Sequence, residues 1–482
     1  MALKRALIFI LVVLTAALLV SEAFAGGYSV AGIGARARSM AGAFRAVADD
    51  WSAMYYNPAG LARMEQSQFN LTLDLNSYRP TFNPQVTLND YDFGYPTGER
   101  YPDDIVINLP NFSLVTVAPF GIPITAAFGI FEQYDENLRW DLYRFADGYG
   151  QPSRNLPNID YQYNLDVLDF HPTIATSFAD DQFHVGVGLS IRKGNLLTNQ
   201  VFLVPGDFGD FPVFRPYDKL VKWGVVDVSG FGFGANVGLL YELNEKLSIG
   251  ATYQTKTKIS MDGNVVTRFY SPDNDAIQTG EGREVDTMFS GYTFEATHEA
   301  DVDMTLPSEF GFGLAFNPSE YVTVAADIVF TRWSEFEDIE VMLRTSRGPL
   351  GLDDWPIISS ILMNDIVYPY GWDDAMRLSL GVEGQPSDAI KLRGGYSYDQ
   401  SPVPDEAGNP LITDTGDRHH LACGISLFHK NFEFAAGGGF SVMPDRDVDE
   451  LLDFNEDGIW DNLSGTYGNS AFNTSFSITV KF

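Results

Sequence analysis

The last eleven residues of the chain alternate strictly between two sets of side chains. One set is Phe472, Thr474, Phe476, Ile478, Val480 and Phe482, and the other is Asn473, Ser475, Ser477, Thr479 and Lys481. A repeat of two residues is the period of a β-strand, whose successive side chains point to opposite faces of its sheet. The segment therefore predicts a strand whose two faces meet different surroundings.

Residues 1–25 have the three parts of a secretory signal peptide. Lys4 and Arg5 supply positive charge, residues 6–20 are apolar, and Ala23 and Ala25 frame a small-residue cleavage site. We therefore expect the mature chain to begin at Gly26. Beyond residue 20 no run of about eighteen apolar residues occurs, which argues against a membrane-spanning helix in the mature chain. If the mature protein resides in a membrane, it must cross as a closed β-barrel, the other structure that satisfies its backbone in lipid.

Composition and charge favour a barrel and exclude nucleic acid as a partner. Aromatic residues make up 14% of the chain, with 36 Phe and 23 Tyr, as expected where aromatic girdles flank a lipid-facing surface. The formal charge is −33, and the acidic residues gather in segments expected to lie between strands, such as residues 90–104, 135–147 and 445–461. These read as solvated extracellular loops. A sharper alternative is that divalent cations link them to anionic lipopolysaccharide.

Period-two segments recur through the chain and predict fourteen strands. They lie at residues 68–78, 111–119, 123–134, 163–179, 183–195, 224–243, 247–259, 299–316, 321–340, 375–385, 389–398, 416–428, 432–442 and 470–482. Tight polar turns join several neighbours, whereas long segments rich in Asp, Pro and Gly separate others. Alternating short and long connections and an even strand number are typical of outer-membrane barrels, with periplasmic turns and extracellular loops.

A short motif follows the predicted signal peptide. Residues 48–62 read Ala-Asp-Asp-Trp-Ser-Ala-Met-Tyr-Tyr-Asn-Pro-Ala-Gly-Leu-Ala, and a segment with Gly32, Gly34 and Gly42 precedes them. Alone, the Asn-Pro step would indicate only a turn, because Pro fixes φ and keeps the residue before it out of the helical region. In this order and position, the two segments resemble the N-terminal hatch of the FadL family. Members of that family are outer-membrane channels for long-chain fatty acids and other hydrophobic compounds.

The resemblance continues through the mature chain at residues 230–242, 250–254, 263–264, 306–307, 330–336, 401–404 and 417–418. The glycines in the first of these segments indicate bends or close backbone approach within strands. A phosphate-binding loop is rejected because no helix signal follows them. The C-terminal Phe482 resembles the signal that the barrel assembly machinery recognises.

The resemblance implies an all-β transmembrane barrel of about fourteen antiparallel strands in the bacterial outer membrane. Residues 1–25 would be the signal peptide, 26–67 a partly helical plug, and 68–482 the barrel. It further implies that the hatch residues Asn57, Pro58 and Ala59 lie deep in the lumen, near an inward kink of the third strand that opens the barrel wall. The candidate kink residues are Phe128, Gly129, Gln133 and Tyr134.

Two sets of polar residues are candidate ligand contacts. Arg36, Arg38 and Arg45 could meet a substrate carboxylate, and ion pairing between plug and barrel is the plainer alternative. Asp453, Asn455, Asp457 and Asp461 follow the spacing of a calcium loop, with Gly458 at its sharp turn but Ser464 in place of the bidentate Glu. We expect a structural calcium ion there at most, and no required cofactor.

Catalysis has little support, because neither a metal-binding His motif nor a nucleophile elbow occurs. We therefore predict a channel for passive uptake of hydrophobic compounds, with outer-membrane lipid and lipopolysaccharide as its surroundings. A porin for polar solutes and a structural or adhesive barrel with acidic loops remain the alternatives.

Overall fold

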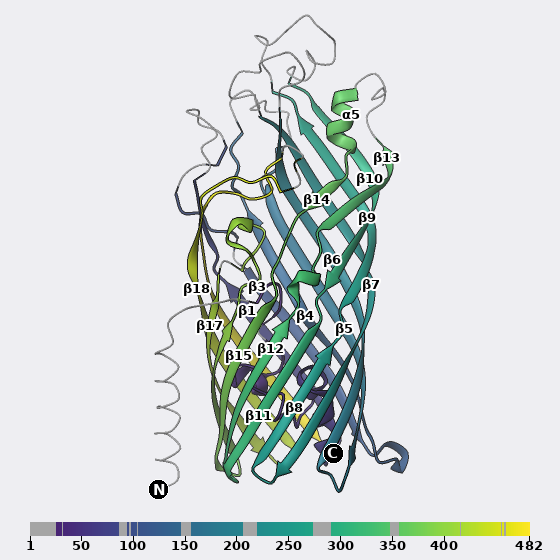
Figure 1. Ribbon diagram of the computed structural model, residues 1–482, viewed down its shortest axis with the longest axis vertical. Coiled ribbons are helices and arrows are strands. Elements are labelled where there is room, and N and C mark those ends of the chain that lie inside the picture. The colour runs from purple at the N-terminus through teal and green to yellow at the C-terminus, as the bar shows by residue number, and fades with distance from the viewer. Residues whose placement is uncertain are drawn as a thin grey trace, which may run out of the picture.

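The computed structural model describes residues 26–30, 32–85, 94–95, 98–103, 105–145, 156–205, 219–272, 291–347, 356–414, 416–454, 456 and 459–482. These residues form a tall antiparallel barrel with a small plug in its lower half (Figure 1). Within this part of the chain, no helix is long and apolar enough to cross a membrane.

Fourteen strands form the wall, as the alternating pattern predicts. In order they are β1 (Gln68–Tyr78) with β2 (Thr81–Pro84), β3 (Ile105–Val117), β4 (Thr125–Trp140), β5 (Tyr161–Phe178), β6 (Phe183–Pro205), β7 (Lys219–Asn244), β8 (Leu247–Gln254) with β9 (Thr257–Tyr270), β10 (Thr293–Leu306) with β11 (Glu309–Ser319), β12 (Val322–Thr331) with β13 (Ile339–Arg347), β14 (Ile366–Tyr368) with β15 (Ala375–Ser387), β16 (Ile390–Asp399), β17 (Arg418–His429), β18 (Phe432–Val448) and β19 (Gly465–Lys481). The barrel closes where β19 pairs with β1, from Gln68 opposite Lys481 to Tyr78 opposite Ala471. The final period-two segment is thus the closing strand.

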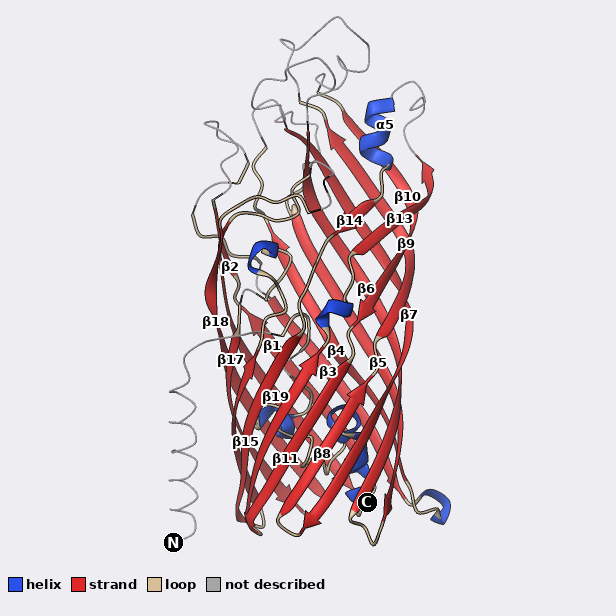
Figure 2. Ribbon diagram, viewed as in Figure 1, coloured by secondary structure: helices blue, strands red, loops and turns tan. Residues whose placement is uncertain are grey.

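The plug contains α2 (Ala35–Ser39), α3 (Ala53–Tyr56) and the 3-10 helix η1 (Pro58–Arg63). Figure 2 shows these helices inside the wall near the end that carries the short turns. Short turns mark the periplasmic end of an outer-membrane barrel. Outside the plug lie η2 (Pro119–Gly121), η5 (Trp333–Glu335), α5 (Pro356–Met363) and η7 (Asp405–Ala407).

The outer surface of the wall changes character along its height. On β11, Phe310, Phe312, Leu314 and Phe316 are between 40% and 51% exposed, and they form part of an apolar belt of the kind that faces lipid. On β10, directly above, the exposed face carries Glu295 and Glu299, and the buried face is apolar apart from His298. The wall therefore continues beyond the apolar belt into a charged, water-facing section.

Several strands differ in extent from their predicted ranges. The predicted strand 299–316 is two strands separated by Pro307 and Ser308, and 321–340 is interrupted where residues 332–338 leave the ladder. The acidic segment 135–147 was expected to be a loop, yet β4 continues through it to Trp140. Asp135 and Glu136 of this segment are buried instead of solvated, and Glu136 Oε2 accepts a hydrogen bond from Thr413 Oγ1 at 2.6 Å.

Candidate functional site

Asn57 holds the turn of the plug against the barrel wall. Its side chain is fully buried, and its Nδ2 donates to Arg45 O at 2.7 Å and to Leu239 O of β7 at 3.1 Å. Its Oδ1 accepts from Ala59 N at 3.1 Å, which caps η1, while Pro58 occupies the first helical position. Pro suits that position because its fixed φ is helical and it has no N–H to leave unpaired. The predicted hatch residues thus form one compact, capped turn deep in the lumen.

Glycines of the wall make room for this turn. A Cβ built at Gly186 of β6 would lie 2.2 Å from the carbonyl carbon of Pro58, and one built at Gly238 of β7 would lie 2.0 Å from Asn57 Oδ1. A third, at Gly250 of β8, would lie 2.3 Å from Arg45 O. Glycine is required at such places because the plug backbone approaches closer than any side chain allows.

The three plug arginines all form ion pairs with barrel carboxylates. Arg36 Nε lies 2.8 Å from Glu383, and Arg38 Nη1 lies 3.2 Å from Asp74. Arg45 pairs with Glu309, and the backbone N–H groups of Phe44 and Arg45 donate to Asp327 Oδ2. This is the plug-to-barrel pairing that the sequence left as the plainer alternative, and contact with a substrate carboxylate stays a prediction.

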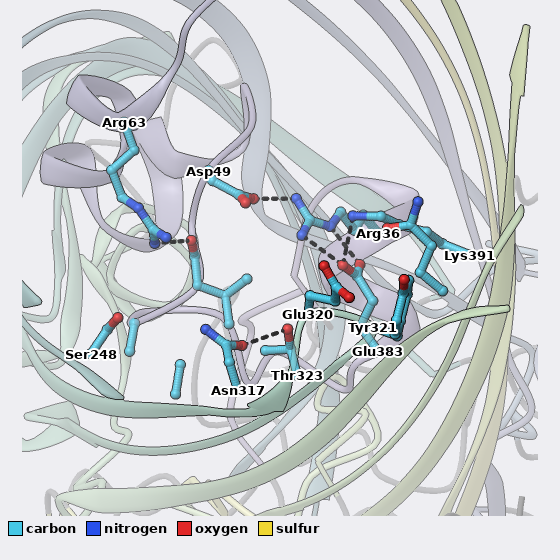
Figure 3. A pocket seen from close by; sticks show the side chains of 14 residues that line it. Arg36, Asp49, Arg63, Ser248, Asn317, Glu320, Tyr321, Thr323, Glu383 and Lys391 are labelled. Carbon is cyan, nitrogen blue, oxygen red and sulfur yellow. Dashed lines mark hydrogen bonds and ion pairs between the residues drawn. The ribbon is translucent and has the colours of Figure 1, made fainter. Parts of the chain in front are cut away.

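Below the plug, a cavity of about 130 Å³ opens between α2 and the lower wall. Figure 3 shows that charged and polar side chains line it, with Arg36 directed at both Asp49 and Glu383. Lys391 Nζ also lies 2.9 Å from Glu383, and Arg63 Nε lies 2.9 Å from Glu242. The periplasmic side of the plug is therefore a floor of ion pairs.

The wall is not continuously paired at the third strand. β3 and β4 pair from Val117 opposite Thr125 up to Phe112 opposite Ile130. Above this point, among the described residues, no backbone pair joins residues 105–111 to residues 131–138, until Asp103 N donates to Arg139 O at 2.9 Å. Each stretch pairs with its other neighbour, β1 or β5, but the two stretches do not pair with each other. We call this gap in the pairing the wall window.

A β-bulge at Gln133 accompanies the wall window. The register of β4 against β5 shifts between Glu132 and Tyr134, so Gln133 is the extra residue. Such bulges bend a strand and redirect its side chains. Of the predicted kink residues, Gln133 and Tyr134 lie at this bulge, whereas Phe128 and Gly129 lie just below the wall window, where β4 still pairs with β3. A Cβ at Gly129 would lie 2.8 Å from Met54 of the plug, so close approach explains this glycine.

The N-terminal residues lie along the bulge on the lumen side. Val30 N donates to Gln133 O at 3.1 Å, and Ser29 forms an isolated antiparallel bridge with Tyr134. The Tyr28 ring stacks on Tyr163 with ring centroids 5.3 Å apart and is tilted against Trp372 at 4.9 Å. We call Tyr28, Tyr163, Tyr370 and Trp372 the aromatic box. Residues 28–30 thus lie against the bulged strand on its lumen side.

A buried polar chain joins the bulge to the plug. Arg192 of β6 is fully buried, and its Nη2 donates to Gln133 Oε1 at 2.6 Å while its Nε lies 3.4 Å from Asp169. His171 lies beside Asp169 and places a ring nitrogen 3.2 Å from Asn236 Oδ1. Asn236 Nδ2 in turn donates to Met54 O of the plug at 2.8 Å. Arg192 was not among the predicted site residues, because Lys193 stands beside it in the same strand and the local sequence does not distinguish the two.

On the extracellular side, residues 400–414 fold down toward Gly27. Gly27 N donates to Asp414 Oδ2 at 2.6 Å, and burial raises the pKa of the Asp414 carboxyl to about 6. A cavity of about 30 Å³ near this segment is lined mainly by aromatic and aliphatic side chains, among them Tyr28, Tyr370, Trp372 and Leu411. This small cavity therefore lies against the aromatic box, and we call it the apolar vestibule.

Only part of the predicted calcium loop lies in the described chain. Asn455 and Asp457 are outside it, and Asp461 accepts a hydrogen bond from Phe454 N at 2.7 Å. Among the described residues, no group of three or more His, Cys, Asp and Glu is placed to hold a metal ion. The calcium site stays a prediction.

Comparison with solved structures agrees with this architecture. A Pseudomonas aeruginosa FadL homologue superposes with a TM-score of 0.74 at 17% identity, covering 95% of this chain and 100% of that one. The toluene transporter TodX of P. putida superposes with a TM-score of 0.67 at 18% identity, covering 94% and 99%. At this level of identity, the likeness establishes the shared fold.

Sequence relatives extend over the same length. A long-chain fatty acid transport protein of Escherichia coli O157:H7 is 24% identical over 459 residues, which cover 90% of this chain and 91% of the relative. Outer membrane protein P1 of Haemophilus influenzae is 20% identical over 424 residues, covering 84% and 80%. The model of the family described as outer membrane protein transport protein (OMPP1/FadL/TodX) matches residues 16–482. The chain therefore belongs to the OMPP1/FadL/TodX family of outer-membrane transport proteins.

Proposed function

We propose that this protein takes up hydrophobic compounds by passive diffusion, and that they leave the lumen sideways through the wall window into the outer membrane. The observation that carries the proposal is the wall window itself, an unpaired stretch of wall beside the plug. The apolar vestibule and the aromatic box lie above the plug and would receive the compound first.

The floor of ion pairs opposes the straight route into the periplasm. A hydrophobic compound passing there would have to separate Arg36 from Glu383 and Asp49 without offering them any polar partner. It would then enter water, where each exposed methylene costs about 0.8 kcal/mol relative to an apolar medium. Moving sideways into lipid avoids both costs, so no energy source is needed.

The surroundings of the wall window favour this exit. On one side, β1 carries Leu71 and Leu73 on its exposed face, at the level where β3 stops pairing with β4. On the other side, β5 places Phe170 and Leu168 beside Ile130 and Glu132 of β4. The lower part of the wall window therefore borders the apolar belt, and its upper part borders the charged section.

The substrates named for relatives include long-chain fatty acids and toluene. Both are apolar enough for the route described. We propose this broad class and assign no single compound, because the aromatic box suits a planar ring while the buried plug arginines are already paired with carboxylates.

Deleting Gln133 tests the exit. Removing the extra residue of the bulge should restore a regular β4 that can pair with β3 along its length. Purified protein in liposomes should then lose uptake of labelled oleate and toluene while keeping the heat-modifiable gel mobility of a folded barrel. A matched control deletes one of the bulged residues between Met443 and Arg446 of β18, which lies away from the wall window.

Two results would refute the proposal. Unchanged hydrophobic uptake by the folded Gln133 deletion would show that the wall window is not the exit. Rapid flux of small sugars through the intact protein would instead favour the polar-solute porin.

A further inference from the structure

The turn between β3 and β4 differs from the other turns at the periplasmic rim. Residues 118–124 read Ala-Pro-Phe-Gly-Ile-Pro-Ile, and they lie within an uncharged stretch that runs from residue 105 to residue 131. The five other short turns that the structure describes at this rim each contain a charged residue, at residues 179–182, 244–246, 317–320, 387–389 and 429–431. A polar turn is expected where a hairpin ends in water.

This turn presents its apolar side chains outward. Phe120 is fully exposed and Ile122 is 50% exposed, and no residue of η2 is buried. In Figures 1 and 2 the turn extends sideways from the lower right of the barrel, away from the lumen and the plug. Among the described residues, none therefore covers Phe120, and half of the Ile122 side chain is also left exposed.

The turn is held in this shape by its own hydrogen bonds. Ala118 N donates to Ile124 O at 2.9 Å, and Gly121 N donates to Ala118 O at 2.9 Å. Ala118 and Phe120 have φ angles of 47° and 58°, in the left-handed region that residues other than glycine seldom adopt. Polar turns at the same rim share such φ values, at residues 179–181 and 430, so the exposed phenyl ring is what sets this turn apart. An exposed phenyl ring is disfavoured in water and favoured in an apolar environment.

We propose that residues 118–124 form a membrane anchor, with Phe120 and Ile122 inserted into the inner, phospholipid leaflet of the outer membrane. The occupant is lipid because the turn continues the apolar belt of its own hairpin, where Leu114 is 41% and Phe128 is 38% exposed. The absence of charge from the described turn also removes the attraction that an acidic or basic protein surface would use.

The anchor sits at one end of the hairpin that borders the wall window. β3 and β4 share only six residue pairs, from Val117 opposite Thr125 to Phe112 opposite Ile130, before the wall window begins. Lipid contact at the tip would hold the lower end of this short ladder at a fixed depth while its upper end stays unpaired. The inference requires the outer-membrane location of the chain and does not depend on the proposed exit route.

Site-directed spin labelling tests the anchor. Cys423→Ala first removes the single native cysteine, and Phe120→Cys then places a nitroxide at the tip. The protein is reconstituted in vesicles of phosphatidylethanolamine and phosphatidylglycerol. Collision rates with oxygen, which concentrates in lipid, are compared with those of a water-soluble nickel chelate. A label at Ile174→Cys on the outer wall gives the collision rates expected in lipid. A label at Glu245→Cys in a polar turn gives the collision rates expected in water.

We expect the label at position 120 to collide with oxygen in preference to the chelate, as the label at 174 does. A label at position 120 that collides with the chelate as readily as the one at 245 would overturn the proposal, since the tip would then lie in the periplasm. Ile122→Cys gives a second probe of the same turn if the first variant fails to assemble, and the same two outcomes apply to it. Heat-modifiable gel mobility identifies the folded barrel in each case.

Discussion

Replacing Asn57 with Ala should release the plug from the wall without unfolding the barrel. The change deletes two hydrogen bonds donated by Nδ2, to Arg45 O and Leu239 O, and one accepted by Oδ1 from Ala59 N. All three lie in a region closed to water, since Asn57 is fully buried. Only the bond to Leu239 O joins the plug to the wall, and the other two hold the turn within the plug, so all three separate the docked plug from a released plug that has also lost this turn. At about 1 kcal/mol each, their loss disfavours the docked, folded plug by about 3 kcal/mol relative to that released state. That shifts the equilibrium between docked and released plug by a factor of about 10².

Hydrogen exchange measured by mass spectrometry reports this equilibrium directly. Peptides covering residues 35–62 should exchange about 10²-fold faster in the Asn57→Ala variant, because exchange follows the population of the open state. Peptides from the central wall strands should exchange at the wild-type rate. Uptake of labelled oleate should fall in the same variant, because a displaced plug no longer supports the N-terminal residues that lie along Gln133.

Asn431→Ala is the matched control. Its Nδ2 also donates to a backbone carbonyl, that of Lys481 at 2.9 Å, but it lies in an exposed periplasmic turn. This variant should match wild type in plug exchange and in uptake. Wild-type exchange in residues 35–62 of the Asn57→Ala variant would refute the reasoning, because it would mean that these buried hydrogen bonds do not hold the plug.

Three further variants test other parts of the site. Gly238→Ala should displace the plug and reduce uptake, because its Cβ would lie 2.0 Å from Asn57 Oδ1 of the hatch turn. Gly384→Ala should be neutral, because nothing lies within 4 Å of its Cβ. Equal uptake by the two variants would contradict this prediction. Arg192→Met should loosen the bulge at Gln133 by leaving a buried carboxylate without its cation, a change that costs about 3 to 5 kcal/mol. Faster exchange confined to β4 and β5 would agree, and unchanged exchange would not. Phe482→Asp should lower the amount of heat-modifiable barrel in the outer membrane. Phe482 is 66% exposed at the end of the closing strand, and its N–H donates to Ser67 O at 2.9 Å. Normal amounts of the variant would contradict the role given to the C-terminus.

The turn of the plug could be predicted because its signals are local, whereas the plug itself was implied by the family resemblance. The turn at Asn57 and Pro58 follows from the restrictions that proline places on itself and on its neighbour. The glycines of β7 were expected to mark bends or close backbone approach, and Gly238 indeed lies against the hatch turn. These local signals do not identify the wall residues that the plug contacts, because Asn57 and Leu239 are brought together only by closure of the barrel.

The resemblance implied a kink of the third strand near residues 128–134, but the extent of the wall window could not be predicted, because it depends on whether two strands pair. Residues 105–131 carry no charge and β4 becomes charged at Glu132, close to its last pair with β3, but charge alone does not say which backbone pairs are missing. The relevant interactions come from elsewhere, from Arg192 on β6 and from Val30 of the N-terminal segment, both of which bind Gln133. Because distant groups stabilise the bulge, its only sign in the local sequence is the glutamine at position 133.

The eighth wall strand shows why alternation alone is insufficient. From Ala296 to Phe316 apolar residues keep to even-numbered positions, which predicts one unbroken strand. In the structure Val302 and Met304 of β10 are buried in the lumen, whereas Phe310 and Phe312 of β11 are exposed on the outside. The interruption at residues 307–308 therefore exchanges the two faces while leaving the period intact. A period of two identifies a strand with an apolar face, but it does not say whether that face meets lipid or lumen. That assignment changes with height, because the lower wall is surrounded by lipid and filled by a plug with ion pairs, while the upper wall is surrounded by water and encloses an apolar interior.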